Sequence, residues 1–518
     1  MDVFLALTPL LVIVIGIIFL KIPIKWASLG TMVFCFILVI LYAFNKGVNP
    51  DAAPLATTVA MKQALNGIID GAKLVFMIWA AFVTMNMLVS CGAMNRIKQL
   101  IATVTVDKRK LAIIIGLGFG GFLEGVAGAG TPAAICAPFL MSMGFPLLKA
   151  AAIPLIFNGV AASLGAFGLT TGSGFAAYVN LAPTDPNYVN VLQVGLVTGC
   201  IHFFGAIAVT LIVSRSFFGK KALTGEHIFF CIMAGVAYGC MQVLLGALAG
   251  AEFPTLFSGL FVLLSTIVYC KIRKPVVAEE FRLPASEQSD AGAVDMSAVR
   301  AMSTYIIMVL LLCAIRIPGN YNPEWMAFLR KVGFAVWIGT AIFITSFIGS
   351  FINKETSKMG GHMLHALQSV IGALFALSCL TAVSNMMKAA GMMTIIANSL
   401  VSVTGPVYPA AAVMIGTLGS FVMGTTLGGN ILFAPIHFTA AQAVQVPQAI
   451  LFASNNAGGA LGNMVCPNNV VACCATINNK EEGKVMSRIA PILIMMWVLY
   501  MILSMIYSYF VFNWMPVM

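Results

Sequence analysis

The sequence predicts an all-α polytopic membrane protein with about 12 transmembrane helices, and three observations lead to this fold class. The chain has 518 residues, of which 60% are hydrophobic and only 9% are charged, whereas a soluble domain carries about 25% charged residues. Apolar runs close to the roughly 20 residues that cross a bilayer recur along the whole chain. Two glycine-rich interruptions lie inside long apolar stretches, which indicates helices that break at membrane depth.

The apolar runs give the expected elements in chain order. Spans are predicted near residues 3–20, 26–44, 72–90, 148–169, 191–213, 228–249, 254–270, 303–316, 333–352, 364–387, 448–474 and 489–512. The stretches 111–145 and 407–444 each contain a glycine cluster midway. We predict that each is a re-entrant helical hairpin, which dips into the membrane and returns to the same side.

The charge distribution sets the expected orientation. The 28 Lys and Arg residues exceed the 17 Asp and Glu residues, for a net charge of +11. The basic residues cluster in short loops, which is the positive-inside pattern and not a nucleic-acid-binding stripe. With the N-terminus outside and two hairpins that do not cross, 21 of the 28 lie on the inner side. We therefore expect a multi-pass membrane protein, with the lipid bilayer as a partner and no nucleic-acid partner.

The two hairpins match each other at a nearly constant offset, which predicts an internal repeat. Gly92 and Gly391, like Gly125 and Gly424, are 299 residues apart. An odd number of predicted spans separates the repeats, so the halves are inverted, as in many secondary transporters. The predicted divisions are a first repeat at 1–215 with a broken helix at 148–169, two linking helices at 226–271, a cytoplasmic linker at 272–302, and a second repeat at 303–518 with a broken helix at 448–474.

The breaks are predicted at two runs of small polar residues, 157–165 (FNGVAASLG) and 454–462 (SNNAGGALG). The N-terminus of a half-helix presents unpaired N–H groups and a partial positive charge, so it binds an anion without Lys or Arg. The alternative is that these polar residues only hold helices together. The predicted substrate-binding residues are Gly128, Gly130, Thr131, Asn158, Gly159, Thr425, Thr426, Asn430, Asn455, Asn456 and Gly458.

Glu124 is the only acidic residue far from any predicted membrane edge. A charged carboxylate at membrane depth costs about 2.5–3.5 kcal/mol on insertion scales, so we predict that Glu124 takes up a coupling proton. The alternative is a permanently neutral or internally bonded Glu that braces the hairpin. His437, after the second hairpin's tip, is a secondary candidate. We expect no metal site and no cofactor beyond the coupling ion, H⁺ or, as the nearest variant, Na⁺ held by Thr425, Thr426 and Asn430.

These motifs resemble those of the L-lactate permease family. The sequence GFLEGVAGAGTP at 121–132 is similar to the family pattern FLEGAAGFGTP, while NILFA at 430–434 and NNAGGALGNM at 455–464 are similar to its NALFA and NTTGGVTGKM elements. The resemblance implies a symporter of a bacterial cell (plasma or inner) membrane that carries lactate and related 2-hydroxy monocarboxylates and is usually driven by protons. It also implies an elevator motion and, often, a homodimer. The positions that match these motifs are Glu124, Gly125, Gly128, Gly130, Thr131, Asn430, Asn455, Gly458 and Gly459.

The chain departs from the family pattern at three positions. Thr426 stands where the family typically has Asp, Asn463 where it has Lys, and Cys466 where it has Ser. The lost acid and base cancel in charge, which is compatible with the loss of an internal ion pair. A small organic anion is therefore a safer prediction than lactate itself.

The predicted function is proton-coupled symport of a small 2-hydroxy monocarboxylate such as L-lactate or glycolate. The alternatives are a sodium-coupled carrier of another small organic anion and a passive anion channel. An intramembrane enzyme is not expected, because the chain has no HExxH, no GxSxG and no paired intramembrane carboxylates.

Overall fold

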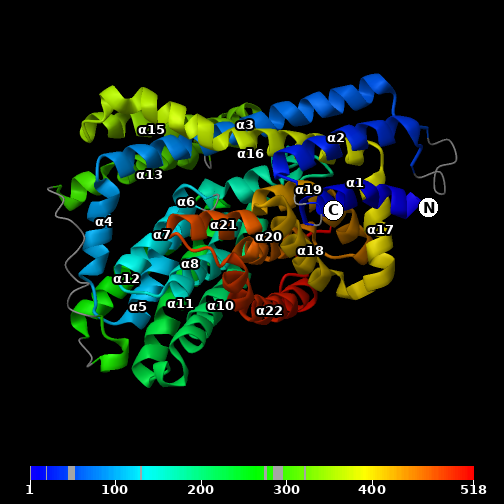
Figure 1. Cartoon of the computed structure of the whole chain (residues 1–518). Helices are drawn as coiled ribbons and strands as arrows, with labels where there is room; N and C mark the ends of the chain where they lie inside the picture. Colours follow the sequence, from blue (N-terminus) through cyan, green and yellow to red (C-terminus); the bar gives the residue numbers. More distant parts are fainter. Residues whose placement is uncertain are drawn as a thin grey trace.

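The computed structural model describes residues 2–18, 20, 22–44, 53–128, 131–273, 277–283, 296–319 and 322–517. Within these ranges the chain is a bundle of helices (Figure 1). Nine helical stretches of the described chain are long and apolar enough to cross a membrane, and four shorter apolar helices accompany them. This is the architecture of a polytopic membrane protein. The number of about 12 crossings stays a prediction.

The described part of the first half of the chain forms twelve α-helices. They are α1 (Asp2–Ile18), α2 (Ile24–Leu41), α3 (Thr57–Ser90), α4 (Ala93–Ala102), α5 (Lys108–Ile113), α6 (Gly120–Val126), α7 (Thr131–Ser142), α8 (Leu147–Ala161), α9 (Ala176–Val179), α10 (Val191–Phe218), α11 (Gly225–Ala249) and α12 (Pro254–Ile272).

The residues described in the second half form ten. They are α13 (Ala298–Gly319), α14 (Pro323–Val332), α15 (Phe334–Ile352), α16 (Met359–Ala389), α17 (Met392–Thr404), α18 (Tyr408–Met423), α19 (Thr426–Val444), α20 (Gln448–Val465), α21 (Pro467–Thr476) and α22 (Glu482–Ile506).

Both stretches predicted as hairpins fold as helix, turn and helix. In the first, α5, a π-helical stretch at Ile114–Phe119 and α6 lead to the tip, and α7 packs back against them. The Cys136 thiol on α7 donates to the Ile115 carbonyl at 3.5 Å. In the second, α18 and α19 pack against each other on either side of a turn at Gly424. The hairpins run over 108–142 and 408–444 rather than 111–145 and 407–444.

The two halves pack on each other through reciprocal pairs of helices. In the proposed repeat, α2 and α3 correspond to α15 and α16, and α8 and α10 correspond to α20 and α22. α2 packs on α16 and α15 packs on α3, while α10 packs on α20 and α22 packs on α8. Gly92 and Gly391 both adopt the left-handed conformation, at φ 79° and φ 74°, where they begin α4 and α17. These contacts support the proposed repeat, whose orientation in a bilayer stays a prediction. Figure 1 shows α3, α15 and α16 along one side of the molecule and α10, α11 and α22 along the other.

The second break differs from the sequence-based expectation, and the first overlaps the predicted run 157–165. In the first half the helix is interrupted after Ala161, and the run 162–168 crosses the interruption with a left-handed stretch at Ala166, Phe167 and Gly168. In the second half the polar run 454–462 is not broken, because α20 continues through it to Val465. The interruption lies instead at Cys466, whose extended backbone (φ −57°, ψ 126°) precedes Pro467, the first residue of α21. Proline is favoured at this first helical position because it has no N–H to satisfy there.

The predicted linker is only partly described. Residues 277–283 lie against the base of the first hairpin, where the Leu283 N–H donates to the Val106 carbonyl at 2.9 Å. The Arg109 guanidinium lies 4.2 Å from the centre of the Phe281 ring. Residues 274–276 and 284–295 lie outside the described chain.

Candidate functional site

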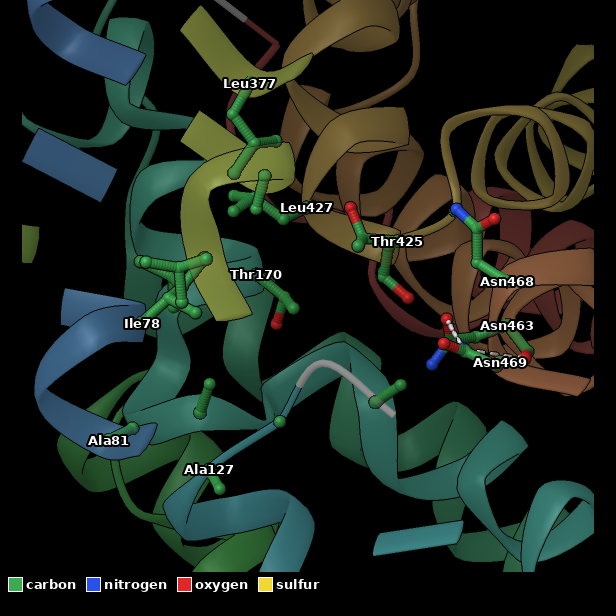
Figure 2. Close-up of a pocket in the computed structure, with 18 of the residues that line it drawn as sticks. Ile78, Ala81, Ala127, Thr170, Leu377, Thr425, Leu427, Asn463, Asn468 and Asn469 are labelled. Atoms are coloured by element: carbon green, nitrogen blue, oxygen red, sulfur yellow. Dashed lines mark hydrogen bonds between the residues drawn. The ribbon is translucent and has the colours of Figure 1, made fainter. Parts of the chain in front are cut away.

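A cavity of about 380 Å³ lies where both hairpin tips and both interruptions meet. Its apolar wall comes from α3 and α16, including Ile78, Ala81 and Leu377. Figure 2 shows these three side chains on one side of the cavity and the amides of Asn463, Asn468 and Asn469 on the other. Among the described residues that line the cavity, Glu124 is the one ionisable side chain, and none is Lys or Arg.

Glu124 sits in the last turn of α6, just before the first tip, and is 2% exposed. Its Oε2 accepts a hydrogen bond from the Asn158 amide at 2.8 Å. Its Oε1 lies against Gly165, where an added Cβ would approach it to 2.6 Å. Only glycine leaves room for this carboxylate at the interruption. Glu124 is therefore buried, with Oε2 hydrogen-bonded to Asn158 and Oε1 against the interruption at Gly165.

Three asparagines extend this contact into a chain. Asn469 donates to Asn463 Oδ1 at 2.6 Å, Asn463 donates to Asn158 Oδ1 at 2.5 Å, and Asn158 donates to Glu124. Asn463 lies at the end of α20 and Asn469 lies in the first turn of α21, so the interruption at Cys466 brings these two residues together. All three are buried. The chain links the second half of the protein to the acid of the first.

The second tip presents a helix N-terminus to the cavity. Gly424 turns the backbone at φ 78°, and the Thr425 hydroxyl caps α19 by accepting from the Gly428 N–H at 3.0 Å. Thr426 is 2% exposed, lines the cavity, and its hydroxyl has no hydrogen-bond partner. A buried unpaired hydroxyl is unfavourable, and such a group calls for an explanation such as a bound ligand. The first N–H groups of a helix also lack intrahelical partners.

A separate polar network lies behind the cavity. Asn430 donates to the Thr170 carbonyl at 2.7 Å and to Asn456 Oδ1 at 2.8 Å, and accepts from Asn455 at 2.8 Å. His437 Nε2 lies 2.8 Å from Asn455 Oδ1. Because that oxygen only accepts, Nε2 carries the hydrogen and donates. These groups satisfy one another, so their observed role is to hold α19, α20 and the first interruption together.

A second buried histidine, His202, lies at the other end of this network. The Ser163 hydroxyl donates to the Asn456 carbonyl at 2.8 Å, so it can accept from His202 Nε2, which lies 2.8 Å away. His202 Nδ1 lies 2.9 Å from the Tyr500 hydroxyl. His202 on α10 and Tyr500 on α22 thus bridge the two halves through one buried imidazole.

The predicted site residues therefore fall into different groups. Glu124, Gly128, Thr425 and Thr426 line the cavity, and Asn158 lies one hydrogen bond behind it. The residues Asn430, Asn455, Asn456 and His437 lie in the buried network and not on the cavity wall.

The remaining predicted glycines and Thr131 have other places. Gly159 and Gly458 serve close packing, because an added Cβ would meet Met464 Cε and the Val413 carbonyl, each at 2.0 Å. Gly130 lies outside the described residues. Thr131 begins α7, and its side chain lies outside the described part.

Sequence reasoning missed several wall residues. Thr170, Asn468 and Asn469 were not predicted, and Asn463 was noted only as a departure from the family pattern, yet all four line the cavity. A signal existed for two of them. Pro467 is typical of the first position of a helix, and a break there would have exposed Asn468 and Asn469, in that first turn, to the site.

Comparisons with known proteins agree with this architecture. The sequence profile described as L-lactate permease matches residues 2–323 and 320–512. The chain is 29% identical to the L-lactate permease of Streptococcus iniae over 450 residues, covering 81% of this chain and 90% of that protein. It is 25% identical to the glycolate permease GlcA of Escherichia coli (strain K12) over 520 residues, covering 91% and 89%.

A solved structure shares the fold. Neisseria gonorrhoeae MtrF, which is described as illuminating a class of antimetabolite efflux pumps, superposes with a TM-score of 0.52 over 93% of this chain and 95% of that one. The sequences are 11% identical. This likeness concerns the fold alone.

Proposed function

Because the chain belongs to the L-lactate permease family, and its curated relatives are permeases rather than enzymes, we propose that it is a proton-coupled symporter of a small 2-hydroxy monocarboxylate such as L-lactate or glycolate. Membership of this family means that the chain is a multi-pass membrane transporter of a small organic anion. The particular substrate and the coupling ion are our proposals. The observation that carries them is a cavity with one buried acid, no basic residue among its described lining, and a helix N-terminus bearing an unpaired hydroxyl.

The substrate's carboxylate binds at the first turn of α19 in this proposal. The N–H groups there carry a partial positive charge, and the Thr426 hydroxyl adds a donor. The first turn of α21, with Asn468 and Asn469, faces the same cavity. Neutral donors of this kind hold an anion without a fixed cation, whose own desolvation at membrane depth is expensive. The substrate hydroxyl then has amide groups within the same wall as partners.

Glu124 carries the coupling proton in this proposal. It is the one ionisable side chain among the described residues of the cavity wall. The sodium variant has less support, because Asn430 lies off the wall with its amide groups engaged, and the Thr425 hydroxyl is already used as a helix cap.

An elevator motion fits the division of the walls. α3 and α16 contribute almost only apolar side chains, whereas the polar groups come from the hairpins, the first interruption and α20–α21. A substrate held by one side alone can travel with that side past a smooth apolar wall. The proposal includes a homodimer, which would keep this wall still; chemical cross-linking in native membranes checks it.

The test is uptake into proteoliposomes. We expect an inward proton gradient to accumulate lactate or glycolate against its concentration gradient, with no requirement for sodium at fixed pH. Glu124→Gln should bind substrate but lose this accumulation. Uptake that never exceeds equilibrium identifies a channel, and uptake that requires sodium identifies the other coupling ion; either result contradicts the proposal.

A further inference from the structure

We propose that the asparagine chain 469–463–158 is a one-way relay that keeps the coupling proton on Oε1 of Glu124, the oxygen that Asn158 does not contact, where it is shared with the substrate's carboxylate. This inference rests on the proposed function. It adds the atom that holds the proton, the positioning residues that choose this atom, and a consequence for the charge of transport.

The direction of the relay is fixed at its far end. Asn469 Nδ2 lies 3.2 Å from the backbone carbonyl of Asn463 and 2.6 Å from its Oδ1. A backbone carbonyl can only accept, so the nitrogen of the Asn469 amide must face it. Asn463 Oδ1 is then an acceptor, and Asn463 Nδ2 remains to donate to Asn158 Oδ1 at 2.5 Å.

The orientation of Asn463 in turn fixes the orientation of the Asn158 amide. With its oxygen occupied, Asn158 can offer only Nδ2 to Glu124, and it does so at 2.8 Å to Oε2. An oxygen that receives this N–H cannot also hold a proton along the same line. A proton on Glu124 is therefore favoured on Oε1, because the carbonyl oxygen of a protonated carboxyl group is the better acceptor for the Asn158 N–H. Oε1 lies 2.6 Å and 3.6 Å from where an added Cβ would lie at Gly165, in the interruption, and at Gly128, at the tip.

Among the described residues that line the cavity around Glu124, none is a cation. The Tyr238 hydroxyl on α11 is a titratable group close enough to interact with Glu124, and it donates to the Val160 carbonyl at 3.3 Å. Glu252, in the buried α11–α12 turn, lies beside Gly168. The α3 and α16 wall carries no ionisable side chain among its described residues. The proton on Oε1 is thus the one mobile positive charge that can meet an anion there.

This arrangement couples proton and substrate directly. Two carboxylates facing each other without a proton repel strongly where water is excluded. When Glu124 takes one proton from water, its O–H donates to the substrate's carboxylate, which is a short and strong kind of hydrogen bond. On release the proton returns to water. The empty acid carries one negative charge, and the loaded pair of carboxylates with one proton carries the same charge, so transport is electroneutral.

Electroneutrality is tested with proteoliposomes containing potassium and valinomycin. A pH gradient alone should drive lactate accumulation. A membrane potential of either sign, at equal pH on both sides, should drive none. Accumulation driven by the potential overturns the inference, because it requires the loaded and empty forms to differ in charge.

The relay is tested by Asn463→Leu, with Asn468→Leu as the matched control on the same wall. In Asn463→Leu the Asn158 amide can turn its oxygen toward Glu124 and accept a proton from Oε2, which takes that hydrogen away from the cavity. Lowering the pH should then improve KM about tenfold less than in the wild type. Asn468→Leu should raise KM by a similar factor at every pH and leave the pH dependence unchanged.

The possible outcomes distinguish a failure of the proposed function from a failure of the relay. Thermal melts check that each variant folds, and Asn469→Leu, which removes the anchor of the relay, replaces Asn463→Leu if that variant does not fold. A wild type without proton-driven uptake refutes the proposed function itself. A proton-driven wild type whose Asn463→Leu variant keeps the full pH dependence of KM refutes the relay alone.

Discussion

At the scale of single residues, Thr426 is expected to help bind the substrate and to lower the stability of the empty protein. Its hydroxyl is buried at the N-terminus of α19 without a partner, so the folded protein without substrate bears the desolvation of this group with no hydrogen bond in return. Thr417, on α18, is the opposite case. Its hydroxyl contacts the Gly458 carbonyl at 2.8 Å and accepts from Trp497 Nε1 at 2.6 Å.

These two threonines give a paired prediction. Thr426→Val keeps the shape and removes the unpaired hydroxyl, so we expect the free energy of unfolding to rise by about 1 kcal/mol and KM to rise about tenfold. Thr417→Val should instead lower the free energy of unfolding by about 1–3 kcal/mol. Denaturation in detergent and uptake kinetics measure both. A Thr426→Val variant with unchanged KM removes this hydroxyl from the site.

At the scale of elements, the contact between α3 and α16 depends on two glycines one helical turn apart. An added Cβ at Gly67 would lie 2.4 Å from the Ala382 backbone, and one at Gly71 would lie 2.4 Å from the Ser378 backbone. Small residues spaced in this way let helix backbones approach closely in membranes. The glycines therefore set the position of the apolar wall that α3 and α16 present to the cavity.

The same substitution at two glycines tests this contact. Gly71→Ala should lower stability by about 1–3 kcal/mol, because the backbone of α16 cannot move aside easily. An added Cβ at Gly30, on the exposed side of α2, would meet no neighbouring atom within 4 Å. Gly30→Ala should therefore raise stability by about 0.5–1 kcal/mol, because it reduces the conformational freedom of the unfolded chain. Thermal melts of the purified protein measure the difference, and equal effects at both positions would contradict the packing argument.

At the scale of the whole molecule, the two hairpins give the proposed inverted repeat a testable form. If the first hairpin opens from inside, both of its ends lie on the inner side, and both ends of the second lie on the outer side. The exposed residues Thr103 and Ser142 flank the first hairpin, and Ser402 and Gln445 flank the second.

Cysteine labelling tests this orientation. In a background without Cys240, the one cysteine classed as exposed among those described, cysteines placed at Thr103 and Ser142 should react only with reagents that reach the inner side. Those at Ser402 and Gln445 should react from outside without permeabilisation. Labelling of Thr103 and Ser142 from opposite sides would mean that residues 108–142 cross the membrane, and the shared cavity would then need another explanation.

The sequence by itself determined the membrane class, both hairpins, the first interruption and the buried acid Glu124. These features follow from local properties of the chain: apolar length, glycine clusters and a carboxylate within an apolar run. The tertiary structure decided which amides reach the cavity. Asn455 and Asn456 point into the buried network, whereas Asn463 and Asn469 line the cavity and connect to Glu124 through Asn158.

The physical reason lies in helix phase and packing. The glycines near 458 in α20 look like a helix break in one dimension, but in three dimensions they let α18 approach, with Gly458 against the Val413 carbonyl. The break moves to Cys466 and Pro467, and the first turn of α21 faces the cavity there. A one-dimensional pattern records which residues are small or polar, and only their neighbours in space decide whether those residues pack, brace or bind.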